Sequence, residues 1–431
     1  MTTRLQEFLP AFLTDGAFYL IVFTLSYALE ADGASGRDVA LVFGIYTCAY
    51  AVVAPLLGRA SDARGRRTSV RLGAGAFALL ACALAAVIRL EPTGIAGAPR
   101  VVLHPAAPGG LRAWTYSAVA GFALANAAFW PALQARLGDR APSAAALARS
   151  VRRFNIGWTA GKACGFLVAG LLFAYAPSAC LPLAAGCAGL VLLCALADRA
   201  GAQAASAGSP PPEHRASERP PRATRRAYLL AALLANLVLW GSLATLKGLA
   251  PKLGAHLGLG PRATGCLLFA ALVAQGLAFA GLGSARRWAY RPGLLRLAAP
   301  SAALGLGFWL LAGQLGGGSA LVFASALLGA ALIGSAQAVT YAASVFYSLD
   351  YDEHRGLRTG IHEAVLGLGG GLEVLGGALA DATAWDGAPL LFMSSGAALG
   401  ALGVAWLLRP RAGGVSANSE GLGALCAGEE G

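Results

Sequence analysis

The chain has 431 residues, of which 57% are hydrophobic and only 13% are charged, too few charges to cover a soluble protein of this length. Its formal net charge of +12 would suit a nucleic-acid-binding protein, but the basic residues lie in short clusters at the ends of apolar runs. Those runs are about 20 residues long, the length that a helix needs to cross a hydrocarbon core. We therefore expect an α-helical integral membrane protein in a lipid bilayer, with no nucleic-acid partner.

The cysteines give no sign of a disulfide framework or a metal site. Seven of the eight lie within apolar runs and the eighth, Cys426, lies in a polar tail. We predict neither a bound metal nor a cofactor. The first apolar run contains Asp15 and has no clear cleavage site, which indicates a retained helix rather than a signal peptide.

Twelve apolar runs are predicted to span the membrane. They are residues 9–29, 39–58, 69–89, 113–134, 155–175, 179–197, 227–249, 263–283, 294–314, 319–341, 360–380 and 388–408. Residues 201–226 are polar and rich in proline, which is typical of a flexible linker. We expect an N-terminal six-helix bundle over 1–200, this cytoplasmic linker, a C-terminal six-helix bundle over 227–410 and a disordered tail over 411–431.

The basic residues predict the orientation, because Lys and Arg resist translocation and collect on the cytoplasmic side. With the N-terminus inside, the cytoplasmic segments contain 25 of the 33 Lys and Arg residues. Both termini are therefore expected in the cytoplasm. Arg outnumbers Lys by 30 to 3 and Ala is abundant, which fits a GC-rich bacterial genome and hence an inner membrane.

The polar residues within the spans follow a three-helix rhythm. The third, sixth, ninth and twelfth spans are almost free of polar side chains and are expected to face lipid. The first, fourth, seventh and tenth each carry two polar or amphipathic residues four positions apart, on one helical face. These pairs are Asp15 and Tyr19, Asn126 and Trp130, Asn236 and Trp240, and Gln337 and Tyr341. We expect them to face an aqueous cavity or one another.

The fifth and eleventh spans match at a constant offset of 206 residues. The matched residues are Arg152, Gly161, Gly165 and Gly170 with Arg358, Gly367, Gly371 and Gly376. Two homologous halves would produce this match. The alternative is chance, because the chain contains 58 glycines.

The most specific motif lies between the second and third spans, where Gly58–Arg67 reads Gly-Arg-Ala-Ser-Asp-Ala-Arg-Gly-Arg-Arg. This segment resembles the loop signature of the major facilitator superfamily of secondary transporters. The resemblance implies twelve transmembrane helices in two pseudo-symmetric six-helix bundles, which rock about a midplane site to give alternating access.

In the family this loop forms a cytoplasmic gate that closes in one state and breaks in the other. Carried onto this sequence, the gate residues are Gly58, Asp62, Arg64, Gly65, Arg66 and Arg67. The alternative is a role in topology alone, which would need the arginines but not the glycines or the acid. In the second half, Gly281–Arg287 keeps the glycine and arginines but has Ala285 where the acid would stand, so we expect no working second copy.

Two departures from the family weaken any inference of antiport. Family antiporters carry a Gly-Pro pair in the fifth helix, and here Phe166 follows Gly165. The fourth span also lacks the mid-helix Arg that is often associated with proton coupling, since Arg112 lies only at its outer edge.

Three ionisable residues are predicted deep in the membrane, Asp15, Lys162 and Glu373, where each costs about 2.5 to 3.5 kcal/mol. One hypothesis is that Glu373 takes up a proton during the cycle, with Lys162 as its charge partner or as an anion contact. The equal alternative is a static ion pair that fixes helix packing. We interpret the adjacent His362 and Glu363 as a cap at the start of the eleventh helix.

Several aromatic residues are candidates either for solute contact or for helix packing. They are Tyr46, Tyr50, Trp130, Trp158 and Trp240.

The sequence therefore predicts secondary active or facilitative transport of a small solute, with protons as a candidate coupling ion, by a monomer. The alternative is an integral-membrane enzyme or a transport-fold sensor. An enzyme is disfavoured because the five histidines are scattered along the chain. No motif identifies the solute, the direction of transport or the coupling ion.

Overall fold

The computed structural model describes residues 3–92, 99–105, 109–141, 144–198, 220–282, 288–316, 319–351 and 355–409. Twelve of its helices are long and apolar enough to cross a membrane, as predicted. They are α1 (Thr3–Ala31), α2 (Gly36–Arg64), α3 (Arg66–Val87), α4 (Leu111–Arg140), α5 (Ala144–Tyr175), α6 (Cys180–Ala197), α8 (Arg222–Gly248), α10 (Pro261–Gly281), α11 (Pro292–Leu315), α12 (Ala320–Tyr351), α13 (Arg355–Thr383) and α14 (Ala388–Leu407).

Four short elements complete the described chain, and sequence analysis did not predict them. The strands β1 (Ile88–Glu91) and β2 (Arg100–Leu103) form an antiparallel hairpin between α3 and α4. The helix α9 (Ala250–His256) follows α8, and the 3₁₀ turn η1 (Pro177–Ala179) precedes α6. The predicted third span runs to residue 89, past the end of α3 at Val87. Ile88 and Leu90 continue the apolar run in the sequence, but both lie in β1, where they are extended and buried.

Several helices are longer than the predicted spans, because a helix continues past the apolar stretch where its termini are capped. Ser35 and Asp38 form a reciprocal capping box that starts α2. Gly65 ends α2 with a φ of +94°, so a single glycine separates α2 from α3. The helix α8 begins at Arg222, inside the predicted linker; residues 201–219 of that linker and the predicted tail lie outside the described residues.

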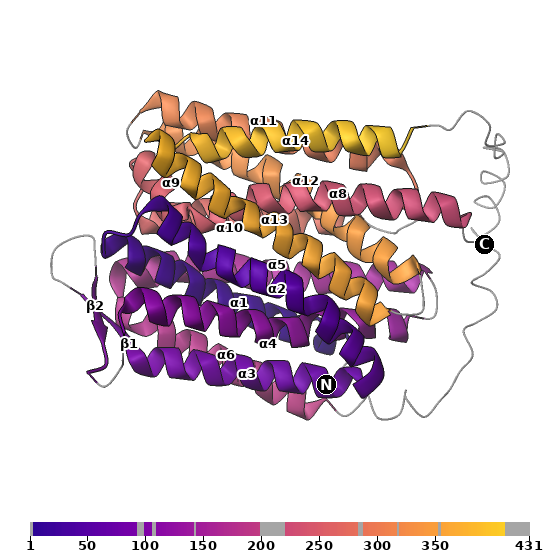
Figure 1. Ribbon diagram of the computed structural model, residues 1–431, viewed down its shortest axis with the longest axis horizontal. Coiled ribbons are helices and arrows are strands. Elements are labelled where there is room, and N and C mark those ends of the chain that lie inside the picture. The colour runs from indigo at the N-terminus through magenta and orange to yellow at the C-terminus, as the bar shows by residue number, and fades with distance from the viewer. Residues whose placement is uncertain are drawn as a thin grey trace.

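The helices run roughly along the long axis of the molecule (Figure 1). We call the end that contains the turn at Gly65 the latch end, and the end that contains β1 and β2 the hairpin end. Because the chain crosses from end to end twelve times, α1 begins and α14 finishes at the latch end. This arrangement places the N-terminus of α13 beside the C-terminus of α2.

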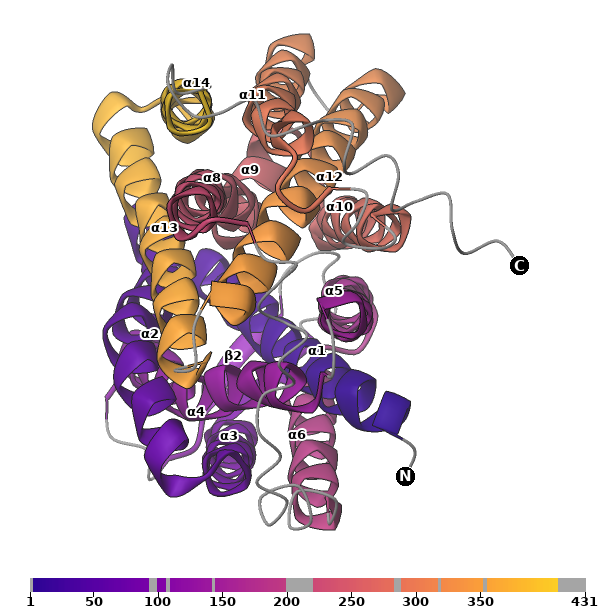
Figure 2. The same cartoon turned by 90° about the vertical axis from the view of Figure 1, so that its right-hand side faces the viewer.

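Viewed down the bundle, α1–α6 occupy one side and α8–α14 the other (Figure 2). Two helix pairs make the most extensive contacts between these halves: α2 packs along α13, and α5 packs along α10. The peripheral helices α3, α6, α11 and α14 bury only 28 to 39% of their most apolar stretch, against 72 to 78% for α1, α4 and α8. The predicted rhythm therefore holds for the peripheral helices and for three of the four central ones, whereas α12, at 50%, is buried no more than α2.

The helices α5 and α13 occupy equivalent places, but the glycines matched by sequence do not. Each helix packs on the first helix of its own half and on the second helix of the other half. Gly161 packs against the α1 backbone at Phe12, within its own half. Its sequence match, Gly367, packs against the α2 backbone at Thr47, across the halves. The offset of 206 therefore pairs glycines that have different neighbours.

Candidate functional site

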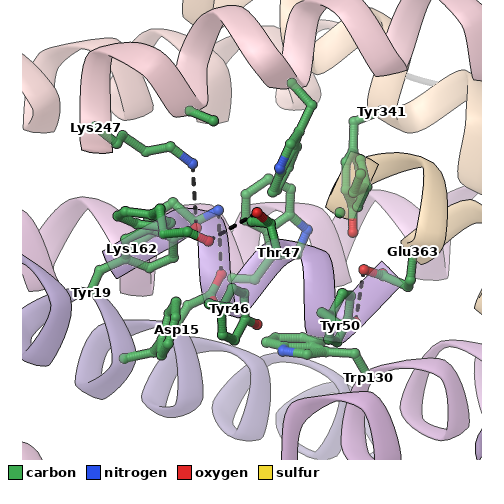
Figure 3. A pocket seen from close by; sticks show the side chains of 17 residues that line it. Asp15, Tyr19, Tyr46, Thr47, Tyr50, Trp130, Lys162, Lys247, Tyr341 and Glu363 are labelled. Carbon is green, nitrogen blue, oxygen red and sulfur yellow. Dashed lines mark hydrogen bonds and ion pairs between the residues drawn. The ribbon is translucent and has the colours of Figure 1, made fainter. Parts of the chain in front are cut away.

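A cavity of about 50 Å³ lies at the centre of the bundle, between the two halves (Figure 3). Its walls come from α1, α2, α4 and α5 of the first half and from α8, α12 and α13 of the second. The lining residues are Asp15, Phe18, Tyr19, Phe43, Tyr46, Thr47, Tyr50, Trp130, Trp158, Lys162, Trp240, Ala244, Lys247, Tyr341, Glu363, Leu366 and Gly367. Since both halves contribute, any rotation of one half against the other must reshape the cavity.

Lys162 of α5 is buried, and its ammonium group is held by one carboxylate and three rings. Its Nζ lies 3.7 Å from Oδ2 of Asp15. It also lies 4.3 to 4.7 Å from the ring centres of Tyr19, Trp158 and Trp240, at distances typical of cation–π contacts. In this conformation no ion pair joins Lys162 to Glu373 among the described residues, so their pairing during the cycle stays a prediction.

Lys247 of α8 is a second buried cation on the same cavity, and sequence analysis did not select it. It is 3% exposed, and its ammonium donates a hydrogen bond to the Tyr19 hydroxyl at 3.3 Å. Its Nζ also lies 5.0 Å from the Tyr19 ring centre and 4.8 Å from that of Trp240. Two lysines from opposite halves therefore share two aromatic rings.

The opposite part of the cavity is acidic. Glu363 accepts hydrogen bonds from the Tyr50 hydroxyl at 2.9 Å and from the Gln134 amide, so its carboxylate joins α13 to α2 and α4. Figure 3 shows Glu363 and Tyr50 on the side of the cavity away from the two lysines. The interpretation of Glu363 as a helix cap is wrong, because α13 begins two turns earlier at Arg355.

Two other ionisable residues of α13 are fully buried but do not line the cavity. The Nδ1 atom of His362 lies 2.5 Å from the Ser344 hydroxyl on α12. Glu373 has no hydrogen-bond partner at either carboxylate oxygen among the described residues. It lies against the end of α8, where a Cβ built on Gly248 would stand 2.5 Å from its Oε2. Glu373 is thus a neighbour of the helix end that carries Lys247, not of Lys162.

The predicted polar pairs divide between cavity and packing. Asp15, Tyr19, Trp130, Trp240 and Tyr341 line the cavity, as do the candidate aromatics Tyr46, Tyr50 and Trp158. Three predicted residues lie behind the wall instead. Asn126 donates to the Tyr46 hydroxyl at 3.1 Å, Asn236 donates to Ser344 at 3.1 Å, and Gln337 is fully buried. Each amide shares a helical face with its lining aromatic but lies four residues, about 6 Å, away along the helix axis, where it does not line the cavity.

At the latch end, Asp62 contacts the opposite half. Its two carboxylate oxygens accept the backbone N–H groups of Gly356 and Leu357, both at 3.1 Å, in the first turn of α13. Unpaired N–H groups and the helix dipole favour a negative charge at this position. Gly58 allows the close approach, since a side chain there would overlap the carbonyl of Gly356. We call this contact the latch-end clamp.

Arginines reinforce the latch-end clamp. Arg66 pairs with Asp62, and its Nε lies 3.1 Å from Asp139 of α4. Arg355 of α13 lies 3.3 Å from the same Asp139, so Asp139 bridges the two halves. No hydrogen bond or ion pair of Arg64 or Arg67 is found within the described part of the chain. Residues 283–287, which contain most of the predicted second copy of the motif, lie outside that part.

The hairpin end carries a matching contact that sequence analysis missed. The oxygens of Asp381, near the end of α13, accept the N–H groups of Gly36 at 2.9 Å and Arg37 at 2.8 Å, in the first turn of α2. We call this contact the hairpin-end clamp. Nearby, Lys252 of α9 pairs with Glu30 of α1 at 2.7 Å. Contacts between the halves are therefore present at both ends of the bundle, on either side of the cavity.

Comparison with known proteins agrees with this architecture. The family model described as Major Facilitator Superfamily matches residues 8–350. A crystal structure of the nucleoside transporter NupG superposes with a TM-score of 0.64 at 13% identity, covering 95% of this chain and 100% of that one. A point mutant of the same transporter gives 0.65 at 11% identity, with the same coverage. No curated protein matches the chain.

Likeness to a solved structure at such low identity shows the fold alone, whereas the family model covers well over half of the sequence. With twelve helices of membrane-spanning length around a central cavity, the chain is a multi-pass membrane transporter of small solutes. It belongs to the Major Facilitator Superfamily.

Proposed function

We propose that the central cavity binds the solute and that the two clamps are the gates of an alternating-access cycle. The observation that carries this proposal is a cavity built by both halves, with contacts between the halves at both ends of the bundle. A cavity of about 50 Å³ holds roughly four waters. The halves must therefore separate at one end before a solute of any size can enter.

The helices α2 and α13 determine how the halves separate. They pack antiparallel from end to end, and an aspartate near the C-terminus of each helix caps the N-terminus of the other. Opening the latch end breaks the Asp62 contact while the Asp381 contact holds, and opening the hairpin end does the reverse. Each state thus loses one clamp and keeps one, which favours exchange between two discrete states.

We infer that the latch end faces the cytoplasm, since 25 of the 33 Lys and Arg residues belong to segments expected on that side. We also propose that the protein lies in an inner membrane and is a monomer. Protease or label accessibility of the turn at Gly65 in sealed cells tests the orientation. Modification of that turn from outside the cell would contradict it.

Proton coupling is proposed through Glu373. An ionised carboxylate at its position has no hydrogen bond to offset burial, so a change in its surroundings between states would change the cost of its charge. Glu373→Gln removes the ionisable group and keeps the shape. We expect the variant to lose transport driven by a pH gradient and to keep exchange between solute pools of equal pH. An unchanged response to the gradient would reject Glu373 as the coupling site.

A nucleoside is one candidate solute. It is the solute named for the similar transporter NupG, and the rings of Trp158, Trp240 and Tyr341 offer planar surfaces for a base. Uridine and adenosine belong in any binding panel for this reason.

Alternating access is tested with a single cysteine in the cavity wall. Ala244 lines the cavity from α8, and Ala244→Cys adds a small reactive group. A membrane-impermeant maleimide added to oriented vesicles should modify this cysteine from either side. The parent protein gives the background from the native cysteines. Modification from one side only would indicate a static receptor rather than a transporter.

A further inference from the structure

The cavity has an excess of positive charge at one end. Lys162 and Lys247 are 1% and 3% exposed, and each is within 5.0 Å of the same Tyr19 ring centre, so the ammonium groups are less than about 10 Å apart. Only Lys162 has a carboxylate within ion-pair distance, namely Asp15 at 3.7 Å. The second acid on the cavity wall, Glu363, is occupied by Tyr50 and Gln134.

Lys247 in particular forms no ion pair among the described residues, although the carboxylates of Asp15 and Glu373 are near enough to attract it. An ammonium group has three donors, and its one hydrogen bond among the described residues goes to a neutral phenol, the Tyr19 hydroxyl. Glu373 is near the same end of α8, but it lies beyond 4.0 Å from the ammonium. A buried cation is costly unless an anion pairs with it, so the site is incomplete as the chain alone builds it.

The walls around these lysines are aromatic. Trp240 and Tyr19 contact both ammonium groups, and Phe43 and Trp158 extend the surface on either side. Such walls bind flat apolar bodies, while the two lysines fix a negatively charged group. The lysines come from opposite halves, so an anion between them would also draw the halves together.

We propose that the solute is an organic anion with a planar apolar body, whose carboxylate or similar group binds between Lys162 and Lys247. This inference rests on the proposed role of the cavity as the transport site. It names the charge that the solute must carry, which that role alone leaves open. Lys247 supplies the unpaired cation, and Lys162 exchanges part of its contact with Asp15 for the anion.

The test uses sets of three compounds that share a body and differ in charge: 4-hydroxybenzoate with its amide and the corresponding benzylamine, and indole-3-acetate with its amide and tryptamine. Uridine and adenosine are added as neutral nucleosides. Binding to the purified protein is measured by thermal stabilisation and by quenching of tryptophan fluorescence. We expect a carboxylate to bind at least tenfold more tightly than its amide, and the amine not to bind.

The variant Lys247→Met removes the charge and keeps an unbranched side chain that is one atom shorter. It should lower affinity for the carboxylate at least tenfold and leave the amide unaffected, so that the preference disappears. Arg89→Met is the matched control, because it removes a positive charge from an exposed position on β1, far from the cavity. If Lys247→Met is too unstable to purify, the affinities of the unmodified protein for acid, amide and amine still test the proposal.

Equal binding of acid and amide, tighter binding of the amine or of a nucleoside, or no response to any carboxylate would each overturn the proposal. None of these outcomes affects alternating access, which the Ala244→Cys labelling reports without any solute. Conversely, carboxylate binding together with labelling from one side only would retain the anion site and reject transport.

Discussion

The two ends of the α2–α13 pair use the same chemistry with unequal support. At each end an aspartate accepts two backbone N–H groups from the first turn of the opposing helix, at 2.8 to 3.1 Å. At the latch end, Arg66 pairs with that aspartate, and Asp139 with Arg355 adds a second link between the halves. At the hairpin end, Lys252 with Glu30 is the corresponding second link, but Asp381 itself has no ion pair among the described residues.

This difference indicates which gate is harder to open. A hydrogen bond to a charged group contributes about 1.5–3 kcal/mol when buried, and an exposed ion pair less than about 1 kcal/mol. The side chains of Asp62 and Arg66 are 20% and 18% exposed, so solvent screens them only partly. We therefore expect the latch end to stay closed more firmly, and the resting protein to open first at the hairpin end. Four predictions test this asymmetry, each with the Ala244→Cys labelling described above.

The largest effect is expected from Gly58→Val. A side chain at Gly58 would overlap the α13 backbone at Gly356, so the latch end could close only by distorting a helix. Overpacking of this kind costs about 1–3 kcal/mol, or roughly a fivefold to 150-fold shift in a two-state equilibrium. Labelling should rise from the latch end and fall from the hairpin end, and transport should be lost. Gly186→Val on the peripheral helix α6 is the control, because nothing lies within 4 Å of its Cβ position; similar behaviour of both variants would contradict the packing argument.

The second effect is expected from Asp62→Asn. Asparagine keeps one acceptor oxygen but loses the ion pair with Arg66 and the charge at the α13 N-terminus. The expected change is about tenfold toward access from the latch end, corresponding to about 1.4 kcal/mol. Asp32→Asn, in the exposed turn before α2, serves as the control. Unchanged access from the latch end would show that the clamp does not hold this gate.

The third prediction is a shift in the opposite direction, toward access from the hairpin end. Asp381→Asn weakens the hairpin-end clamp, so labelling should increase from the hairpin end and decrease from the latch end. An exposed charge at a helix N-terminus is worth about 0.3–1 kcal/mol, so we expect a two- to fivefold change. Combining Asp62→Asn with Asp381→Asn should restore much of the original balance. A shift in the same direction for both single variants would contradict opposed gates.

The sequence was sufficient for the twelve spans and the latch end. Span length follows from membrane thickness and can be counted, and the Gly58–Arg67 spacing identifies one clamp partner. The other partner is a pair of backbone N–H groups at Gly356 and Leu357, and no side-chain pattern in the sequence shows that α13 is the helix that provides them. The hairpin-end clamp was missed for the same reason, because a lone Asp381 beyond a span resembles any loop acid.

The cavity was predicted only in part. Polar residues four apart on one face selected Asp15, Tyr19, Trp130, Trp240 and Tyr341, but the same rule also selected amides that pack between helices. Lys247 was missed because it lies at the end of a span and was counted with the outer charges. One signal in the sequence could have found it. The chain has 30 arginines and three lysines, and its basic residues at helix ends are mostly arginines. A lysine within a span is therefore unusual for this chain and is a candidate for a specific role.

The smallest effects should come from single ion pairs between the halves. Arg355→Gln removes the link between Asp139 and α13 at the latch end, and Glu30→Gln removes the 2.7 Å pair with Lys252 at the hairpin end. Partly exposed pairs contribute about 0.2–1 kcal/mol, so each variant should change access at its own end by no more than about fivefold.

Salt distinguishes these pairs from the packing contacts. Raising the ionic strength from about 0.01 to 1 M shortens the Debye length from about 30 to 3 Å and should reproduce both variants in the unmodified protein. Because Arg66 pairs with the clamp aspartate at the latch end, whereas Asp381 has no ion pair among the described residues, salt should also shift the balance toward access from the latch end. A shift toward access from the hairpin end would mean that the arginines of the latch end do not cause the difference between the two gates.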